Sequence, residues 1–98
     1  MNFSEKVYSL CKKIPKGKVS TYKEIANALN CKAYRAVGNA LKENPYAPKV
    51  PCHRVVNSKG FLHGFKTGLR NKKKLLEKEG IKIKNNKILY FEKVFYKF

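Results

Sequence analysis

Positive charge is the feature that most restricts how this chain can fold. Lys and Arg together number 23 among 98 residues, against 6 Asp and Glu, which gives a formal net charge of +17. Self-repulsion of this size destabilises a compact state unless an anionic partner offsets it. Nucleic acid is a strong candidate, because Lys and Arg release condensed counterions from phosphates. The charge therefore favours a nucleic-acid-binding protein, and a basic protein with no such partner is the alternative.

The apolar content is sufficient for one core. Hydrophobic residues make up 43% of the chain and include six Tyr and six Phe, which excludes a disordered chain. No stretch approaches the ~20 apolar residues that a membrane span requires, and the N-terminus lacks a signal-peptide core. We expect one domain over residues 1–98, in the cytoplasm and without membrane contact.

The cysteines do not form a disulfide or zinc pattern. Cys11, Cys31 and Cys52 are odd in number and widely spaced. Zinc sites usually bring ligands in close pairs, and here the only close pair is Cys52 and His53. We expect no metal and no cofactor. Cys11 falls in an apolar stripe and is interpreted as a packed side chain.

Apolar periodicity predicts four helices, over residues 3–14, 22–30, 32–43 and 69–79. Thr21 and Glu24 fit a capping box at the start of the second helix, and Gly80 suits the end of the fourth. The fourth helix should turn Leu69, Leu75 and Leu76 inward, with Lys72, Lys73 and Lys74 largely outward. In the third helix the residues expected to pack inward are Ala33, Ala36, Val37, Ala40 and Leu41.

Short strands are predicted between and after these helices. Val55–Val56 and residues 61–62 would form a small wing around the turn at 57–60. Residues 81–83 and 88–91 would form a terminal hairpin around Asn85–Asn86. The fold class is therefore α+β and mostly α: a winged helix-turn-helix single domain with a small wing and a C-terminal β-hairpin.

The pair Cys52–His53 is the candidate reactive site. A thiolate is the nucleophilic form of cysteine, and a nearby base is needed to form it near neutral pH. Adjacent side chains in an extended segment point apart, so the pair alone leaves a merely packed cysteine open.

The residues around this pair extend the pattern. The segment PCHRV (51–55) resembles the active-site signature of the O6-alkylguanine-DNA alkyltransferases. Further blocks resemble the same family in the same order, over about residues 15–80: GKVSTY (17–22), RAVG (35–38), NP (44–45), GF (64–65), GL (68–69) and LLEKEG (75–80).

The resemblance implies a role for each catalytic residue. Cys52 would take the alkyl group from guanine O6 in one displacement and keep it as a thioether. His53 would accept the thiol proton through a water, and Glu79 would orient His53. Asn44 would hold the loop before the cysteine, and Tyr22 would donate a hydrogen bond as the guanine leaves.

The resemblance also implies how DNA is bound. The partner would be double-stranded DNA containing O6-alkylguanine, bound by a monomer that turns the nucleotide out of the helix. Arg35 would fill the gap in the base stack. The expected DNA-binding residues are Arg35, Tyr22, Ala36, Gly38 and Asn39, and the expected pocket residues are Val55, Phe65 and Lys66.

Two other functions remain open. The family usually carries an additional N-terminal α/β domain, which this chain does not contain. Alkyltransferase-like proteins also lack that domain; they bind alkylated guanine without reacting and commonly have Trp at the cysteine position, whereas this chain has Cys52 and no Trp. A plain winged-helix regulator would explain the charge and the helix pair, but not the Cys-His-Arg segment.

Overall fold

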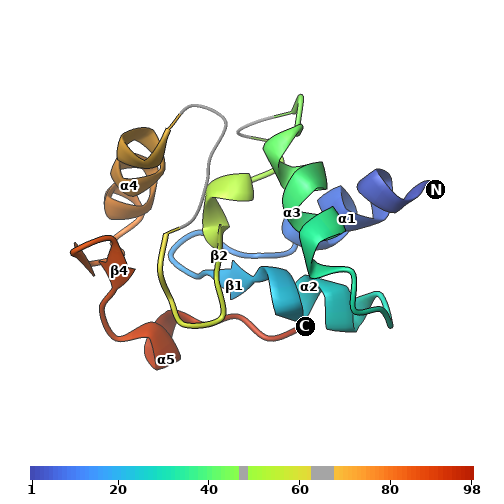
Figure 1. Ribbon diagram of the computed structural model, residues 1–98. Coiled ribbons are helices and arrows are strands. Elements are labelled where there is room, and N and C mark those ends of the chain that lie inside the picture. Colours follow the sequence, from blue (N-terminus) through green and yellow to red (C-terminus); the bar gives the residue numbers. More distant parts are fainter. Residues whose placement is uncertain (47–48, 63–67) are drawn as a thin grey trace.

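The computed structural model describes residues 1–46, 49–62 and 68–98, which form short helices and four two-residue strands (Figure 1). The α-helices are α1 (Phe3–Cys11), α2 (Tyr22–Ala28), α3 (Tyr34–Lys42), α4 (Leu69–Lys78) and α5 (Phe91–Val94), and η1 (Cys52–Arg54) is a turn of 3-10 helix. The strands are β1 (Ser20–Thr21), β2 (Val55–Val56), β3 (Ile83–Lys84) and β4 (Lys87–Ile88). The mixed, mostly helical class is confirmed.

Strands β1 and β2 divide the molecule into two cores. They pair in parallel, with Ser20 opposite Val55 and Thr21 opposite Val56. Figure 1 shows them between α1–α3 on one side and α4, the β3–β4 hairpin and α5 on the other. Successive side chains of a strand point to opposite faces. Accordingly Val55 joins the first core, which is built by α1–α3. Val56 joins the second core, which consists of Val19, Val56, Leu62, Leu76, Ile81 and Ile88.

Local capping sets where the first two α-helices begin. The Asn2 side chain accepts from Glu5 N at 2.8 Å and caps α1. The predicted cap of α2 is confirmed in its first half, because Thr21 Oγ1 accepts from Glu24 N at 3.0 Å. The Glu24 carboxylate instead accepts from Phe98 N at 3.3 Å, and no hydrogen bond from it back to Thr21 is seen among the described residues.

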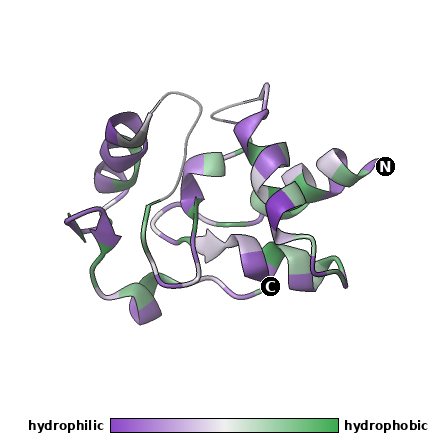
Figure 2. Ribbon diagram, in the orientation of Figure 1, coloured by the Kyte–Doolittle hydropathy of each residue, from purple (hydrophilic) through white to green (hydrophobic). Residues whose placement is uncertain are grey.

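Two predicted helices are shorter or less buried than expected. Helix α1 ends at Cys11 rather than residue 14, because the amides of Lys13 and Ile14 bond three residues back in a tight turn. Helix α3 buries Val37, Ala40 and Leu41, but Ala33 and Ala36 are exposed. The reason is that α3 packs on α1 and α2 through a narrow stripe. In Figure 2 most of α4 has the colour of hydrophilic residues.

The predicted pairing of residues 61–62 with the Val55–Val56 strand is wrong. Strand β2 already pairs with β1, and Asn57 Oδ1 accepts from the amides of Lys59 and Phe61, which closes a turn. Phe61 forms an antiparallel bridge with Lys87 instead. The segment 57–62 is therefore a loop, and its last three residues pair with the C-terminal hairpin.

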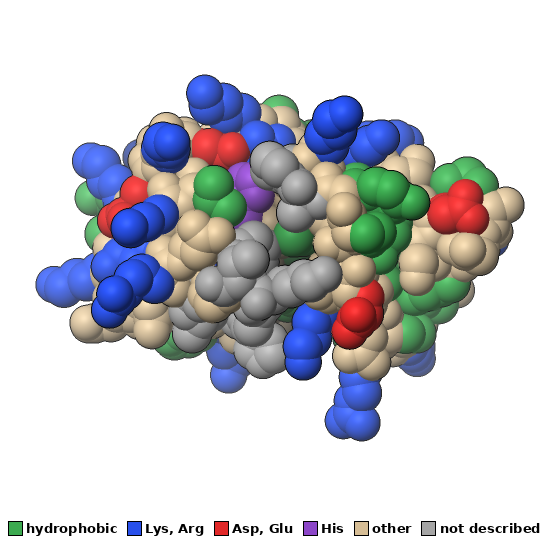
Figure 3. Space-filling view, turned by 90° about the horizontal axis from the view of Figure 1, so that it is seen from above, with side chains coloured by type: hydrophobic (Ala, Val, Ile, Leu, Met, Phe, Trp, Pro, Cys, Tyr) green, Lys and Arg blue, Asp and Glu red, His purple; other side chains and the backbone are tan. Residues whose placement is uncertain are grey.

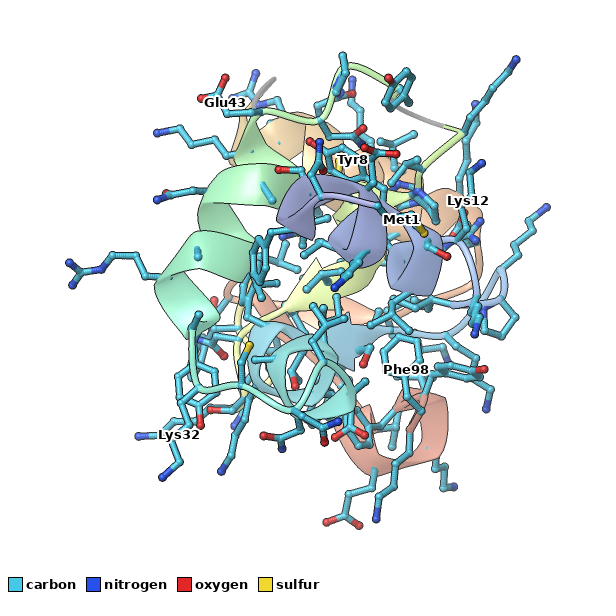
Figure 4. All side chains as sticks on the ribbon, turned by 90° about the vertical axis from the view of Figure 1, so that its right-hand side faces the viewer. Met1, Tyr8, Lys12, Lys32, Glu43 and Phe98 are labelled. Carbon is cyan, nitrogen blue, oxygen red and sulfur yellow. The ribbon has the colours of Figure 1, made fainter. Side chains whose placement is uncertain are left out.

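The C-terminal segment returns to the start of the chain. The predicted hairpin is confirmed: Asn85 and Asn86 have φ of 53° and 59°, as the mirror-image turn between β3 and β4 requires. The second strand, predicted over residues 88–91, ends at Ile88, and helix α5 begins at Phe91. Val19 N then donates to Val94 O at 2.8 Å, and Tyr96 N donates to Val19 O at 2.7 Å. Phe98, labelled in Figure 4, packs against the first core.

Candidate active site

Cys52 lies between the loop that follows α3 and strand β2, and its side chain belongs to the first core. It begins η1, directly before β2, and is 6% exposed. Sequence reasoning treated this segment as extended, but Arg54 N donates to Pro51 O at 2.9 Å and closes a helical turn. The turn places Cys52 in the first core while His53 reaches α4.

His53 and Arg54, the two residues after Cys52 in the chain, form a hydrogen-bonded cluster with Glu79. His53 Nε2 lies 3.1 Å from Glu79 Oε2. The Arg54 guanidinium binds the same carboxylate, with Nη2 at 2.6 Å from Oε2 and Nε at 2.9 Å from Oε1. The predicted contact between His53 and Glu79 is thus present. Sequence analysis gave Arg54 no separate role, although charge-assisted pairs of this kind are strong.

Burial and hydrogen bonding act in opposite directions on this cluster. Burial lowers the pKa of His53 below its ordinary 6.5, and the Glu79 hydrogen bond opposes part of that shift. Burial alone would raise the pKa of Glu79, but hydrogen bonds from Arg54 and His53 outweigh it and lower the pKa overall. At neutral pH the imidazole is therefore neutral and the carboxylate ionised. Since Nε2 faces Glu79, Nδ1 is the ring nitrogen left for another proton.

The end of α4 positions the Glu79 carboxylate. Gly80 N donates to Glu77 O and Ile81 N donates to Leu76 O, which is the paired C-terminal cap that a glycine at φ +91° permits. Glu79 caps the helix, one residue before that glycine. An open pocket on this side of the molecule is lined by Lys16, His53, Arg54, Leu75, Lys78 and Glu79. Seen from above, the histidine lies beside an acidic side chain on a face rimmed by Lys and Arg (Figure 3).

Asn44 holds the loop that leads to Cys52. It is 3% exposed, its Nδ2 donates to Val50 O at 2.9 Å, and its Oδ1 accepts from Tyr46 N at 2.9 Å. The Tyr46 ring packs edge-on against Tyr8 with 5.9 Å between centroids. Asn44 therefore joins the two ends of the loop, in the position that the resemblance implied.

Lys72 is the buried residue that sequence analysis placed wrongly. It was predicted to point outward, but it is 0% exposed and its Nζ donates to Val55 O at 2.7 Å. Position 72 lies one turn before the buried Leu76, so helical spacing alone predicts that it is buried. The charge of lysine led to the opposite prediction. A long aliphatic stem lets lysine pack in a core while its ammonium finds an acceptor. Burial lowers the pKa of Lys72 to about 8, although the Cys52 and Cys11 thiols oppose the shift.

Tyr22 lies near the same group of side chains. Lys72 Nζ is 6.0 Å from the centroid of its ring. Burial raises the pKa of Tyr22 to about 12, and the Cys52 and Cys11 thiols act in the same direction. The phenol is therefore protonated at neutral pH, as a hydrogen-bond donor to a leaving oxygen must be.

The other predicted residues fall into three groups. On α3, Arg35, Ala36 and Asn39 are exposed and Gly38 is half-buried. A Cβ added at Gly38 would lie 3.9 Å from the Tyr22 ring, which is ordinary van der Waals contact. Val55 is buried and its carbonyl accepts from Lys72. Phe65 and Lys66 lie outside the described residues.

Within residues 1–46, 49–62 and 68–98, no cluster of three or more His, Cys, Asp or Glu side chains is placed to hold a metal ion. In the same part of the chain, no helix has the length and apolar character to cross a membrane.

A buried cysteine followed by a histidine that bonds a carboxylate is the arrangement of proteins that use a cysteine nucleophile. Residues 2–81 match the family described as 6-O-methylguanine DNA methyltransferase, DNA binding domain. The chain belongs to this family.

Relatives agree with that assignment. A methylated-DNA–protein-cysteine methyltransferase of Sulfolobus acidocaldarius is 49% identical over 82 residues, covering 84% of this chain and 52% of the relative. The chain thus spans about half the length of this relative. Mycobacterium tuberculosis OGT in complex with DNA is 41% identical with a TM-score of 0.78, over 81% of this chain and 50% of that one. S. pombe Atl1, in complex with damaged DNA containing O6-carboxymethylguanine, is 36% identical with a TM-score of 0.86, over 97% and 94%.

Proposed function

We propose that this domain repairs DNA by transferring an alkyl group from guanine O6 to Cys52 and keeping it. The observation that carries the proposal is the His53–Glu79 contact of 3.1 Å directly after the buried Cys52. It gives the residue that follows the thiol in the chain the form of a base with an orienting group, which is what a cysteine nucleophile requires. The names of the curated relatives, which span more than this domain, support the same reaction.

The proposed reaction is one displacement that needs no cofactor. Cys52 Sγ forms a bond to the alkyl carbon as the bond from that carbon to guanine O6 breaks. The thiol proton passes to His53, through a water, and Glu79 stabilises the resulting imidazolium. Tyr22 donates a hydrogen bond to guanine O6 as it leaves. The proton that His53 took from Cys52 then passes through solvent to the guanine, which is released neutral. The thioether is stable, and each molecule therefore reacts once.

We further propose that α2 and α3 form a helix-turn-helix that holds duplex DNA, with segment 57–62 as the wing. The exposed face of α3 presents Arg35, Ala36 and Asn39, and the small side chain of Ala36 permits a close approach. Arg35 would occupy the space left when the nucleotide turns out. Val55, Phe65 and Lys66 would line the base pocket. The protein would act as a monomer, on DNA inside the cell.

A second candidate function is lesion binding without transfer. It is favoured by the similarity to Atl1, which extends over 97% of this chain and 94% of that one. Cys52 argues against it, since a thiol with a neighbouring base is reactive.

Intact-protein mass spectrometry separates the two functions. The protein is incubated with a duplex that contains one O6-methylguanine. We expect a gain of one methylene per molecule, located on Cys52 by peptide mapping. An unchanged mass together with tight, lesion-selective binding would mean that the protein senses damage and does not transfer.

The transfer rate is expected to fall as the pH drops from neutral, with its midpoint below pH 6.5. Burial holds the pKa of His53 under its ordinary 6.5, and only the neutral imidazole can accept a proton. Single-turnover rates measured from neutral pH down to about pH 5 give the midpoint. A midpoint above 6.5 would contradict the assignment of His53 as the base.

The free energy of unfolding should also depend on the protonation of His53. Because the folded state binds a proton on His53 less readily than the unfolded state, the free energy of unfolding falls as pH drops through 6.5 towards the folded pKa. Below the folded pKa this contribution is lost, and further acidification no longer changes it through His53. A His53→Gln variant serves as the control, since it should lack this part of the pH dependence.

A further inference from the structure

The β3–β4 hairpin is joined to segment 57–62 by backbone pairing. Lys87 forms an antiparallel bridge with Phe61. Leu62 N donates to Asn86 O at 2.8 Å, and Ile88 N donates to Gly60 O at 2.9 Å. The hairpin thus extends the outer edge of that segment, and it lies beyond the residues that match the family.

The exposed surface of this joined unit is cationic. Lys59 on the segment and Lys82, Lys84 and Lys87 on the hairpin are exposed, as are the turn residues Asn85 and Asn86. Lys87 Nζ lies 5.4 Å over the ring of Phe61, which is 39% exposed. The sequence has no Asp or Glu from residue 57 to 62 or from residue 80 to 91. No carboxylate of either segment offsets these charges.

The size of the molecule suits a DNA partner. Its longest dimension is 35 Å, close to one turn of duplex DNA, about 34–36 Å. Figure 1 shows α1–α3 towards one end and the hairpin towards the other, with segment 57–62 between α2 and the hairpin. A duplex held by α3 can therefore continue past segment 57–62 to the hairpin.

We propose that the β3–β4 hairpin is a second DNA-binding element, which contacts the phosphate backbone to one side of the lesion through Lys84 and Lys87. The inference rests on the proposed function, because it assumes that α3 and segment 57–62 face the duplex. Lysine binds phosphate as a point charge and reads no base, so this contact adds affinity without sequence preference. Its contribution must depend strongly on salt.

The test compares Lys84→Gln/Lys87→Gln with a matched control, Lys12→Gln/Lys13→Gln. The control removes the same charge at the end of α1, and Figure 4 shows Lys12 on the opposite side of the molecule from Lys32, which precedes α3. Binding to an unmodified duplex of about 16 base pairs, longer than one turn, is measured by fluorescence anisotropy over a range of salt concentrations. An unmodified duplex keeps the measurement independent of alkyl transfer.

The hairpin variant should bind about tenfold more weakly at low salt, and the slope of log affinity against log salt should shrink by about one per lysine removed. The control should change affinity and slope much less. Lys84→Arg/Lys87→Arg should retain the wild-type slope, because both positive charges are kept. Equal slopes for the hairpin variant and the control would overturn the proposal.

The outcomes for the hairpin and for the proposed function are separable. A hairpin-dependent slope in a wild-type protein that gains no methylene would support the hairpin contact and refute alkyl transfer. A methylene gain with a slope independent of Lys84 and Lys87 would do the reverse.

Discussion

A Cys52→Ser variant is expected to lose alkyl transfer, with a fall in the single-turnover rate of roughly 10⁴-fold or more. A serine hydroxyl beside His53 is a far weaker nucleophile than a thiol, and no step of the proposed reaction can replace it. The substitution is close in size to cysteine, so the first core should remain packed. The measurement is intact-protein mass after incubation with an O6-methylguanine duplex.

The other cysteines provide the control. Burial raises the pKa of Cys11 to about 12, so its thiol stays protonated and should not substitute for Cys52. Cys31 is half-buried in the turn between α2 and α3, and Cys31→Ser should transfer at the wild-type rate. Duplex binding by Cys52→Ser should persist, since α3 is untouched. Methyl transfer that survives in Cys52→Ser would place the acceptor elsewhere.

Glu79→Gln is expected to have the second largest effect, on both stability and rate. The carboxylate side chain is 11% exposed and the Arg54 side chain 17% exposed, so the change leaves a guanidinium largely buried without its counter-charge. We expect a loss of about 2–3 kcal/mol in the free energy of unfolding, measured with urea. The transfer rate should fall about 10²-fold, because the His53 imidazolium loses its stabilising anion.

Glu77→Gln is the matched control for this variant. Glu77 is exposed on the same helix, so its unfolding free energy should stay within about 0.5 kcal/mol of the wild type. Equal urea midpoints for the two variants would show that the Arg54–Glu79 pair does not stabilise the fold. A stable Glu79→Gln variant with a wild-type rate would remove Glu79 from the proposed mechanism.

Local signals predicted local structure correctly. Thr21 caps α2, Gly80 ends α4, and Asn85 and Asn86 form the hairpin turn, because each acts through hydrogen bonds or dihedral angles within a few residues. The contact between His53 and Glu79 spans 26 residues. No periodicity reveals such a contact, and only the family resemblance suggested it.

Long-range packing explains the parts that sequence reasoning missed. Lys72 was assigned to solvent because its charge outweighed its position beside Leu76, yet Val55 O supplies a buried acceptor from another element. Residue 61 was paired with the wrong strand, since its partner Lys87 comes from a hairpin that looked independent in the sequence. The return of the chain end to Val19 depends on both cores being in place.

That return has a consequence for how the protein is made. Val19 N donates to Val94 O, Val19 O accepts from Tyr96 N, and Lys18 Nζ donates to Lys93 O, 75 residues further along the chain. During synthesis α1–α3 leave the ribosome before residues 93–96 have been made, so this part of the chain is at first only partly folded. The contacts around Val19, directly before β1, therefore form only after residues 93–96 have been made.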